Sequence, residues 1–235
     1  MTKEAIVLAG GMGTRLRTVV SDVPKPMAPV NGRPFLAYVL DDLCEQGIER
    51  VILAVGYKRE VIIDTFGINY RGMELRYSIE EEALGTGGGI KQAFDLVAGE
   101  RAYVLNGDTY FRVNLGEMDS FFDENQCDMA LALKPMTNFD RYGTVKIDEE
   151  SCRVLGFEEK QQRDAGLING GVYLFGKSLW NGLNLGEKFS FEKEILEGLF
   201  ASHALCGMVS DTYFIDIGIP SDYEQSQHDF AALRA

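Results

Sequence analysis

The chain has 235 residues, with 23 lysines and arginines against 36 aspartates and glutamates, so its formal net charge is −13. A field of this sign repels DNA, RNA and anionic membranes, and no broad nucleic-acid or membrane surface is expected. The four cysteines form no C-x-x-C pair, which argues against a typical zinc site. No apolar stretch approaches the ~20 residues of a membrane span, and the apolar run at the N-terminus is too short for a signal peptide. We therefore expect a soluble, cytoplasmic protein.

Short apolar strands alternate with amphipathic helices through the first half of the chain. The pattern predicts strands at 5–9, 50–55, 74–79 and 102–105, and helices at 34–46, 60–66 and 89–97. This alternation is typical of a doubly wound, mostly parallel sheet, in which ligands bind beyond the carboxyl ends of the strands. No linker or internal repeat interrupts it, so one domain over residues 1–235 is favoured.

The second half is less regular. Strands are expected at 128–134, 144–147 and 171–175. A helix is expected at 189–200, with Ser190 as its N-cap. Ser221 and Glu224 form a capping-box pattern that predicts the start of a last helix.

A glycine-rich loop at 10–16 follows the first predicted strand directly. Its glycines allow backbone N–H groups to approach an anion closely, and Arg15 adds a charged fork suited to phosphate oxygens. Lys25, between two prolines, is a second cation on a stiffened segment. The loop lacks the Lys-Ser or Lys-Thr of a Walker A motif, and Leu16 stands where a dinucleotide fingerprint needs its third glycine. The loop therefore predicts a phosphate site of another kind.

The segment 8–16, followed by Pro24-Lys25-Pro26-Met27, is similar to the opening signature of the sugar-phosphate nucleotidyltransferases. The resemblance extends from Ile6 to Tyr223. It implies a Rossmann-like sheet with a small antiparallel sugar-binding element, in which about residues 1–130 bind the nucleotide and about 131–235 the sugar phosphate. It implies catalytic roles for Arg15 and Lys25. The residues expected to bind the nucleotide are Leu8, Gly10, Gly11, Gly13, Thr14, Glu80, Gly85 and Thr86.

Two aspartates are candidates for holding a metal ion. Asp108 ends a predicted strand in Asn-Gly-Asp, and Asp216 lies far away in sequence in Ile-Asp-Ile-Gly. Carboxylates suit a hard cation such as Mg²⁺, and the resemblance implies that these two hold the catalytic metal, with Asp108 also acting in catalysis. A sugar 1-phosphate oxygen could then attack the α-phosphorus and expel pyrophosphate, with catalysis by positioning and charge neutralisation.

An acidic run at 80–82 precedes the glycines at 85 and 87–89. By resemblance this segment faces the nucleobase. A carboxylate there can accept from guanine N1–H and N2–H₂, whereas uracil and thymine offer one N–H. Glu80 is favoured by its spacing to Gly85, with Glu81 as the rival, and a solvated acidic loop is the alternative interpretation.

The resemblance also implies which residues bind the sugar phosphate. They are Asn106, Gly107, Glu158, Lys160, Asn169 and Gly170. Arg141, in the shared element Asp140-Arg141-Tyr142-Gly143, is expected to act structurally, because Arg-Tyr-Gly also makes a good turn into a strand.

Within the family, the pattern most resembles the bacterial D-glycero-α-D-manno-heptose 1-phosphate guanylyltransferases. The segments 21–29, 77–80, 138–143, 166–171 and 213–220 carry this similarity. It implies GTP and heptose 1-phosphate as substrates and GDP-heptose, a precursor of capsule or other surface glycans, as product. Mannose-1-phosphate guanylyltransferase and N-acetylmuramate-1-phosphate uridylyltransferase are the alternatives within the family, and an inactive nucleotide-binding regulatory subunit or a Rossmann oxidoreductase the alternatives outside it. A homodimer through the aromatics at 121, 122 and 180 is one interpretation, although core burial is the commoner fate of such residues.

Overall fold

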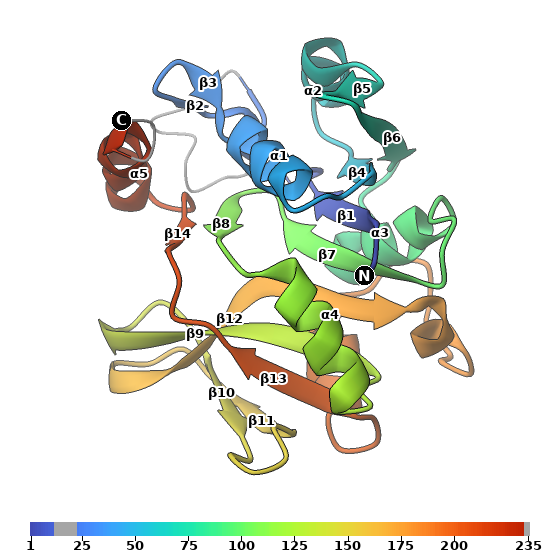
Figure 1. The fold of residues 1–235 in the computed structure, drawn as a ribbon, viewed down its shortest axis with the longest axis vertical. Helices are drawn as coiled ribbons and strands as arrows, with labels where there is room; N and C mark the ends of the chain where they lie inside the picture. Colours follow the sequence, from blue (N-terminus) through green and yellow to red (C-terminus); the bar gives the residue numbers. More distant parts are fainter. Residues whose placement is uncertain (12–22, 233–235) are drawn as a thin grey trace.

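A central β-sheet with helices on both faces organises the protein (Figure 1). The computed structural model describes residues 1–11 and 23–232. Four parallel strands form the middle of the sheet in the order β7–β1–β4–β6. They are β1 (Glu4–Leu8), β4 (Arg50–Val55), β6 (Met73–Ile79) and β7 (Arg101–Asn106). The mostly parallel sheet expected from the sequence is confirmed.

An antiparallel extension continues the sheet beyond β7. Its long strand β12 (Arg163–Gly176) pairs with β9 (Met129–Phe139) along most of its length, and also with β10 (Thr144–Ile147) at Ile168 and with β7 from Val172 to Gly176. The strand β11 (Val154–Glu158) pairs antiparallel with β10, and β13 (Leu205–Val209) completes the extension by pairing parallel with β9. Both β9 and β12 are longer than expected, because their pairing with each other extends over most of both strands. The extension is the small antiparallel element that the sequence implied.

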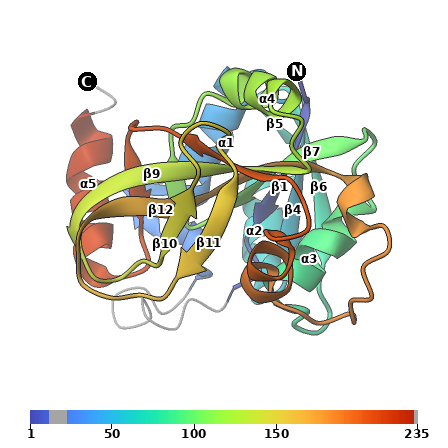
Figure 2. The ribbon, with the colours of Figure 1, turned by 90° about the horizontal axis from the view of Figure 1, so that it is seen from below.

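Helices cover the two faces of the sheet (Figure 2). The helices α1 (Phe35–Glu45), α4 (Leu115–Glu124) and α5 (Pro220–Ala232) contribute to one hydrophobic cluster, as does α2 (Arg59–Phe66). On the other face, α3 (Gly85–Phe94) packs with the π-helical segment η3 (Phe191–Glu197). Successive side chains of β1 point to opposite faces of the sheet, as in any strand. Val7 therefore packs in the first cluster and Ile6 in the second.

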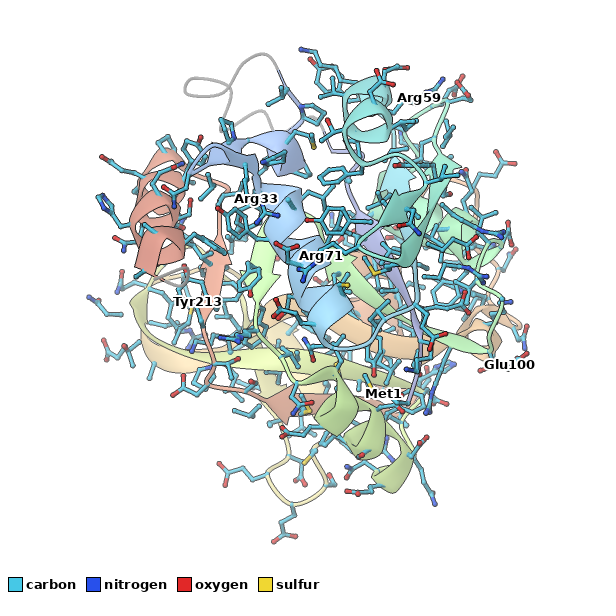
Figure 3. The ribbon with its side chains drawn as sticks, turned by 45° about the horizontal axis from the view of Figure 1, so that its top comes forward. Met1, Arg33, Arg59, Arg71, Glu100 and Tyr213 are labelled. Carbon is cyan, nitrogen blue, oxygen red and sulfur yellow. The ribbon has the colours of Figure 1, made fainter. Side chains whose placement is uncertain are left out.

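Several short elements complete the fold. They are η1 (Lys25–Met27), β2 (Pro29–Val30), β3 (Arg33–Pro34), β5 (Asn69–Tyr70), β8 (Thr109–Phe111), η2 (Lys177–Trp180) and β14 (Phe214–Asp216). Arg33 belongs to β3, which directly precedes α1 in the chain, and Arg71 follows β5. Both arginines, labelled in Figure 3, pair with Asp41 of α1, at 2.8 and 3.0 Å. These contacts fix the face of α1 that points away from the core.

Two helix predictions needed adjustment, and one helix was not predicted. The helix expected at 89–97 begins at Gly85, because the glycines thought to form a turn make its first turn. The capping box at Ser221 is wrong, since the helix begins at Pro220 and Ser221 lies inside it. The prediction missed α4, although Asn114 caps it by accepting a hydrogen bond from the Glu117 backbone N–H at 3.1 Å.

The structure also bears on the predicted N-cap Ser190 and on the aromatic rings at 121, 122 and 180. Ser190 does cap η3, accepting from the Lys193 backbone N–H at 3.3 Å. Trp180 packs against Phe94 and Phe175, and the aromatics at 121 and 122 pack against the core, which removes the reason for assigning these rings to a dimer surface. Within 1–11 and 23–232, no helix is long and apolar enough to cross a membrane.

Candidate active site

Two adjoining cavities open beside the carboxyl ends of the parallel strands. One, the strand-end cavity, measures about 580 Å³ and is lined by residues that follow β1, β6 and β7. The other, the extension cavity, measures about 460 Å³ and lies mainly against the antiparallel extension. Clefts at the ends of parallel strands are where open α/β sheets bind ligands.

The strand-end cavity gathers most of the residues predicted for the nucleotide. Its lining includes Leu8, Gly10, Gly11, Glu80, Gly85 and Thr86, together with Lys25 and Asp108. These residues come from separate strands and helices, and the parallel order of the sheet brings them to one edge. The predictions for Gly13, Thr14, Arg15 and Leu16 lie outside the described residues.

Glu80 faces the strand-end cavity from a prepared position. Its Oε2 accepts a hydrogen bond from the Leu84 backbone N–H at 3.1 Å. Its Oε1 lies where a Cβ on Gly10 or Gly89 would come within 3.1 or 2.8 Å, so both glycines make room for the carboxylate. Burial raises the pKa of Glu80, and the Leu84 N–H partly offsets this. A carboxylate fixed in this way presents acceptor oxygens to the cavity.

The neighbouring Glu81 has a different environment. It pairs at 3.1 Å with Arg59 of α2, which is labelled in Figure 3. Its side chain is 78% exposed and does not line the cavity. Between the two candidates that the sequence left open, the structure places Glu80 at the cavity.

Lys25, Asp108 and Asp216 meet at the edge of both cavities. The Lys25 Nζ lies 2.5 Å from Asp108 Oδ2 and 3.3 Å from Asp216 Oδ1. The two aspartates are close because β14 pairs with β8, with Asp216 opposite Thr109. Asp216 also accepts from the Gly218 backbone N–H at 2.7 Å. Burial raises the pKa of Asp216, the nearby Asp108 adds to this rise, and the charge of Lys25 opposes it.

These two carboxylates have the donor atoms of a hard-cation site. The ammonium group between them already demonstrates room for a positive charge. No group of three His, Cys, Asp or Glu side chains in 1–11 and 23–232 is arranged to hold a metal by itself. Mg²⁺ is commonly bound by one or two carboxylates together with substrate phosphates and water, so the donor atoms of these two carboxylates fit that ion.

The extension cavity gathers four residues predicted for the sugar phosphate from the antiparallel extension, and Asn106 from the end of β7. The four are Glu158, Lys160, Asn169 and Gly170. Asn169 is held at both ends of its amide: its Oδ1 accepts from the Gly171 N–H at 3.1 Å and its Nδ2 donates to the Tyr173 hydroxyl at 2.8 Å. Burial raises the pKa of Tyr173, which keeps that hydroxyl neutral. The cavity therefore offers fixed polar groups suited to hydroxyl recognition.

The charged residues of this cavity differ in their partners. Glu158 pairs with Lys146 and Arg163, each at 2.7 Å, and accepts from Thr144 at 2.8 Å. Hydrogen bonds from Lys146 and Thr144 lower the pKa of Glu158. Lys160 forms no ion pair with the part of the chain that the structure describes, so its ammonium is available to a ligand.

Two predicted residues have other positions. Gly107 lines neither cavity, and its role as a sugar-binding residue stays a prediction: its N–H donates to the Leu8 carbonyl at 2.9 Å, and a Cβ there would lie 2.5 Å from that oxygen. It is a glycine because β7 and the end of β1 approach closely. Arg141 pairs with Asp222 at 2.5 Å and lines neither cavity, in agreement with its structural interpretation.

Sequence reasoning missed Glu192. This residue of η3 lines both cavities, and among the described residues only Asn106 shares that property. The Thr86 hydroxyl donates to Glu192 Oε2 at 2.7 Å, which links the first turn of α3 to η3. No local motif marks Glu192, because its position depends on the packing of two helices distant in sequence.

The arrangement can hold two ligands end to end. A ligand in each cavity would place one end of each beside Lys25, Asp108 and Asp216. A cation between two carboxylates at such a junction suits reactions between anionic groups, in which catalysis consists of positioning and neutralising charge.

Comparison with known proteins identifies the family. Residues 4–232 match the model of the nucleotidyl transferase family. The chain is 51% identical over 224 residues to a D-glycero-α-D-manno-heptose 1-phosphate guanylyltransferase of Aneurinibacillus thermoaerophilus, covering 95% of this chain and 96% of that protein. It is 50% identical over 220 residues to the protein of the same name from Campylobacter jejuni subsp. jejuni serotype O:2, with 94% and 96% covered.

A solved structure agrees with these relatives. The crystal structure of HddC from Yersinia pseudotuberculosis, complexed with GMP-PN, has a TM-score of 0.88 and 35% identity, and the match covers 97% of this chain and 100% of that one. The chain belongs to the nucleotidyl transferase family.

Proposed function

We propose that this protein transfers GMP from GTP to D-glycero-α-D-manno-heptose 1-phosphate, forming GDP-heptose and pyrophosphate. The observation that carries the proposal is the meeting of two cavities at Lys25, Asp108 and Asp216. A nucleotide and a sugar phosphate bound there would bring their phosphates together at one charged junction.

The reaction needs no nucleophile from the protein. An oxygen of the sugar phosphate attacks the α-phosphorus of GTP, forming a new P–O bond, while the bond between the α-phosphorus and the bridging oxygen breaks and pyrophosphate leaves. The chain's own contribution is to orient the two ligands and to stabilise developing negative charge. Lys25 is suited to this role because its ammonium lies at the junction, and Arg15 is proposed as a second cation.

We propose Mg²⁺ as the cofactor, held by Asp108 and Asp216. The support is the pair of hard oxygen donors on either side of a cation position. When bound, the ion supplies charge neutralisation for the phosphate oxygens. Lys25 remains within reach of both carboxylates and of the junction.

Guanine is the proposed base because Glu80 presents fixed acceptor oxygens in the strand-end cavity. Guanine offers two adjacent donors to such a carboxylate, whereas uracil offers one. The relatives at 50–51% identity bear the name of guanylyltransferases, which supports the same choice.

Heptose 1-phosphate is the proposed acceptor because both of those relatives are named for it. Asn106, Lys160, Asn169 and Gly170 would bind it in the extension cavity. A mannose-1-phosphate guanylyltransferase of Mycobacterium tuberculosis is 36% identical over 229 residues, and the match covers 64% of that protein. Mannose 1-phosphate is therefore the competing acceptor to be tested.

The test is pyrophosphate release from each of GTP, UTP, ATP and CTP in the presence of a panel of sugar 1-phosphates. We expect the highest kcat/KM for GTP with D-glycero-α-D-manno-heptose 1-phosphate. A preference for UTP would overturn the guanylyl assignment, and a preference for mannose 1-phosphate the heptose assignment. Nucleotide binding without turnover of any acceptor would favour a regulatory protein. A cytoplasmic location, a homodimer and a role in surface-glycan synthesis are further proposals that fractionation, light scattering and gene deletion would test.

A further inference from the structure

Glu192 occupies the boundary between the two cavities. It lines the strand-end cavity with Lys25 and Asp108 and the extension cavity with Asn169. The function proposed above assigns Glu192 no role. A carboxylate in this position can contact a ligand that spans the two cavities.

Protein hydroxyl groups fix one side of this carboxylate. Glu192 Oε2 accepts from the Thr86 hydroxyl at 2.7 Å and from the Ser190 hydroxyl at 2.8 Å. The Thr86 hydroxyl in turn accepts from the Phe191 backbone N–H at 2.9 Å. Glu192 Oε1 accepts no hydrogen bond from any residue in 1–11 or 23–232, so it is available to a ligand.

The π-helical geometry of η3 brings a second carboxylate to the same wall. Glu192 and Glu197, five residues apart, both line the extension cavity. In an α-helix of 3.6 residues per turn, residues five apart differ by about 140° around the axis, whereas the i→i+5 ladder of a π-helix stacks them on one side. Glu197 lines only the extension cavity. It therefore provides a matched control on the same element.

The chemistry of the boundary restricts what Glu192 can bind. A carboxylate repels phosphate oxygens and accepts hydrogen bonds from hydroxyl groups. A sugar 1-phosphate must point its phosphate toward the junction for its oxygen to reach the α-phosphorus. The ring hydroxyl next to the anomeric carbon, on C2, is then the sugar hydroxyl closest to the boundary.

We propose that Glu192 Oε1 accepts a hydrogen bond from the C2 hydroxyl of the sugar 1-phosphate, and that Glu192 is a specificity-determining residue for that position. The inference rests on the proposed transfer to a sugar 1-phosphate. Thr86 and Ser190 are positioning residues, since they hold the other carboxylate oxygen.

The experiment compares the parent sugar 1-phosphate with its 2-deoxy analogue in the wild-type chain and in Glu192→Ala. In the wild type, the loss of a hydrogen bond to a charged group should lower kcat/KM by about 10–100-fold for the 2-deoxy compound. In Glu192→Ala, both compounds should react slowly and at rates within about threefold of each other, because the partner of the C2 hydroxyl is gone. A merely structural role would slow both compounds equally and leave the wild-type ratio.

Two further variants keep the test decisive. Glu197→Gln makes the same charge change on the same helix and should retain the wild-type ratio of parent to 2-deoxy rates. Glu192→Gln preserves size and one acceptor oxygen, and should give a ratio below that of the wild type even if Glu192→Ala fails to fold.

Three results would overturn the inference. One is a wild-type ratio in both Glu192 variants while the parent sugar 1-phosphate is turned over. A second is that the Glu192 variants keep the wild-type ratio of parent to 2-deoxy sugar rates but change the ratio of rates with GTP to rates with 2′-deoxy-GTP or 3′-deoxy-GTP. That result would place Glu192 at the ribose. Absence of turnover with every sugar 1-phosphate by the wild-type chain is a separate result, because it would remove the proposed function and this inference with it.

Discussion

Replacing Asp108 by asparagine removes one negative charge from the junction of the two cavities while preserving the size of the side chain. Lys25 would keep its second partner, Asp216, at 3.3 Å. The side chain of Asp108 is 34% exposed and that of Lys25 12%. Asp108 is partly open to solvent and Lys25 retains Asp216, so the loss of this pair should cost about as much as that of a surface ion pair, roughly 0–1 kcal/mol. The free energy of unfolding should therefore fall by no more than about 1 kcal/mol.

The effect on turnover should be much larger. Removing one group that stabilises transition-state charge typically lowers kcat by about 10²–10³-fold, or roughly 3–4 kcal/mol. Asp108→Asn should therefore lower kcat/KM by at least about 10²-fold and require more Mg²⁺ for its residual activity. Pyrophosphate release from GTP and heptose 1-phosphate over a series of Mg²⁺ concentrations measures kcat/KM and the Mg²⁺ requirement. Urea unfolding of the same samples measures the free energy of unfolding.

The control is Asp211→Asn. Asp211 pairs with Lys134 at 2.6 Å, its side chain is 81% exposed, and it lines neither cavity. This variant should retain the turnover of the wild type. Near-normal kcat/KM for Asp108→Asn at every Mg²⁺ concentration would refute the metal assignment. A loss of unfolding free energy above about 3 kcal/mol would instead assign Asp108 to the fold.

Three other substitutions test separate parts of the structure. Gly107→Ala places a Cβ 2.5 Å from the Leu8 carbonyl, so thermal or urea unfolding should show a loss of about 1–3 kcal/mol, with reduced turnover because Asp108 moves. Burial raises the pKa of Asp42 from 3.8 to about 6. The contribution of Asp42 to the free energy of unfolding is thus fully present below pH 3.8 and is lost as the pH rises through about 6. In urea unfolding from pH 4 to pH 8, the free energy of unfolding of Asp42→Asn should therefore rise by up to about 3 kcal/mol relative to the wild type. Glu80→Gln replaces one acceptor oxygen by a donor and should lower kcat/KM for GTP by about 5–150-fold.

Two of these predictions have a matched control, and the third has an outcome that would contradict it. Gly156→Ala meets no atom within 4 Å and should leave stability nearly unchanged. Parallel stability curves for Asp42→Asn and the wild type across that pH range would contradict the burial argument. Glu81→Gln alters a carboxylate paired with Arg59 outside the cavity, so equal losses in Glu80→Gln and Glu81→Gln would remove the guanine argument.

Much of the nucleotide half could be predicted because its signals are local. The apolar run before Gly10 and the strand at 50–55 carry the period and length of buried strands, and β4 begins and ends at the predicted residues. The rule that ligands bind beyond the carboxyl ends of parallel strands then marked Gly10 and Asp108, which both follow predicted strands. The structure agrees on both residues. Local pattern and sheet geometry were sufficient here.

The extension was less predictable because its pairing is long-range. β12 pairs with β9 along most of its length and with β10 and then β7 as well, a pattern that no alternation of side chains encodes. The ion pairs of Glu158 with Lys146 and Arg163 follow from that pairing. The packing role of Gly107 depends instead on the pairing of β7 with β1, where its close neighbour Leu8 lies.

The sequence by itself determined the alternation of strands and helices, the glycine-rich strand end and the chemical types of the site residues, because these depend on residue periodicity and side-chain chemistry. Only the tertiary structure decided which of them meet. Asp216 reaches Asp108 through the pairing of β14 with β8, and Glu192 reaches Thr86 through the packing of η3 on α3. Contacts between residues more than 100 positions apart depend on how the whole chain packs, and no local pattern encodes that packing.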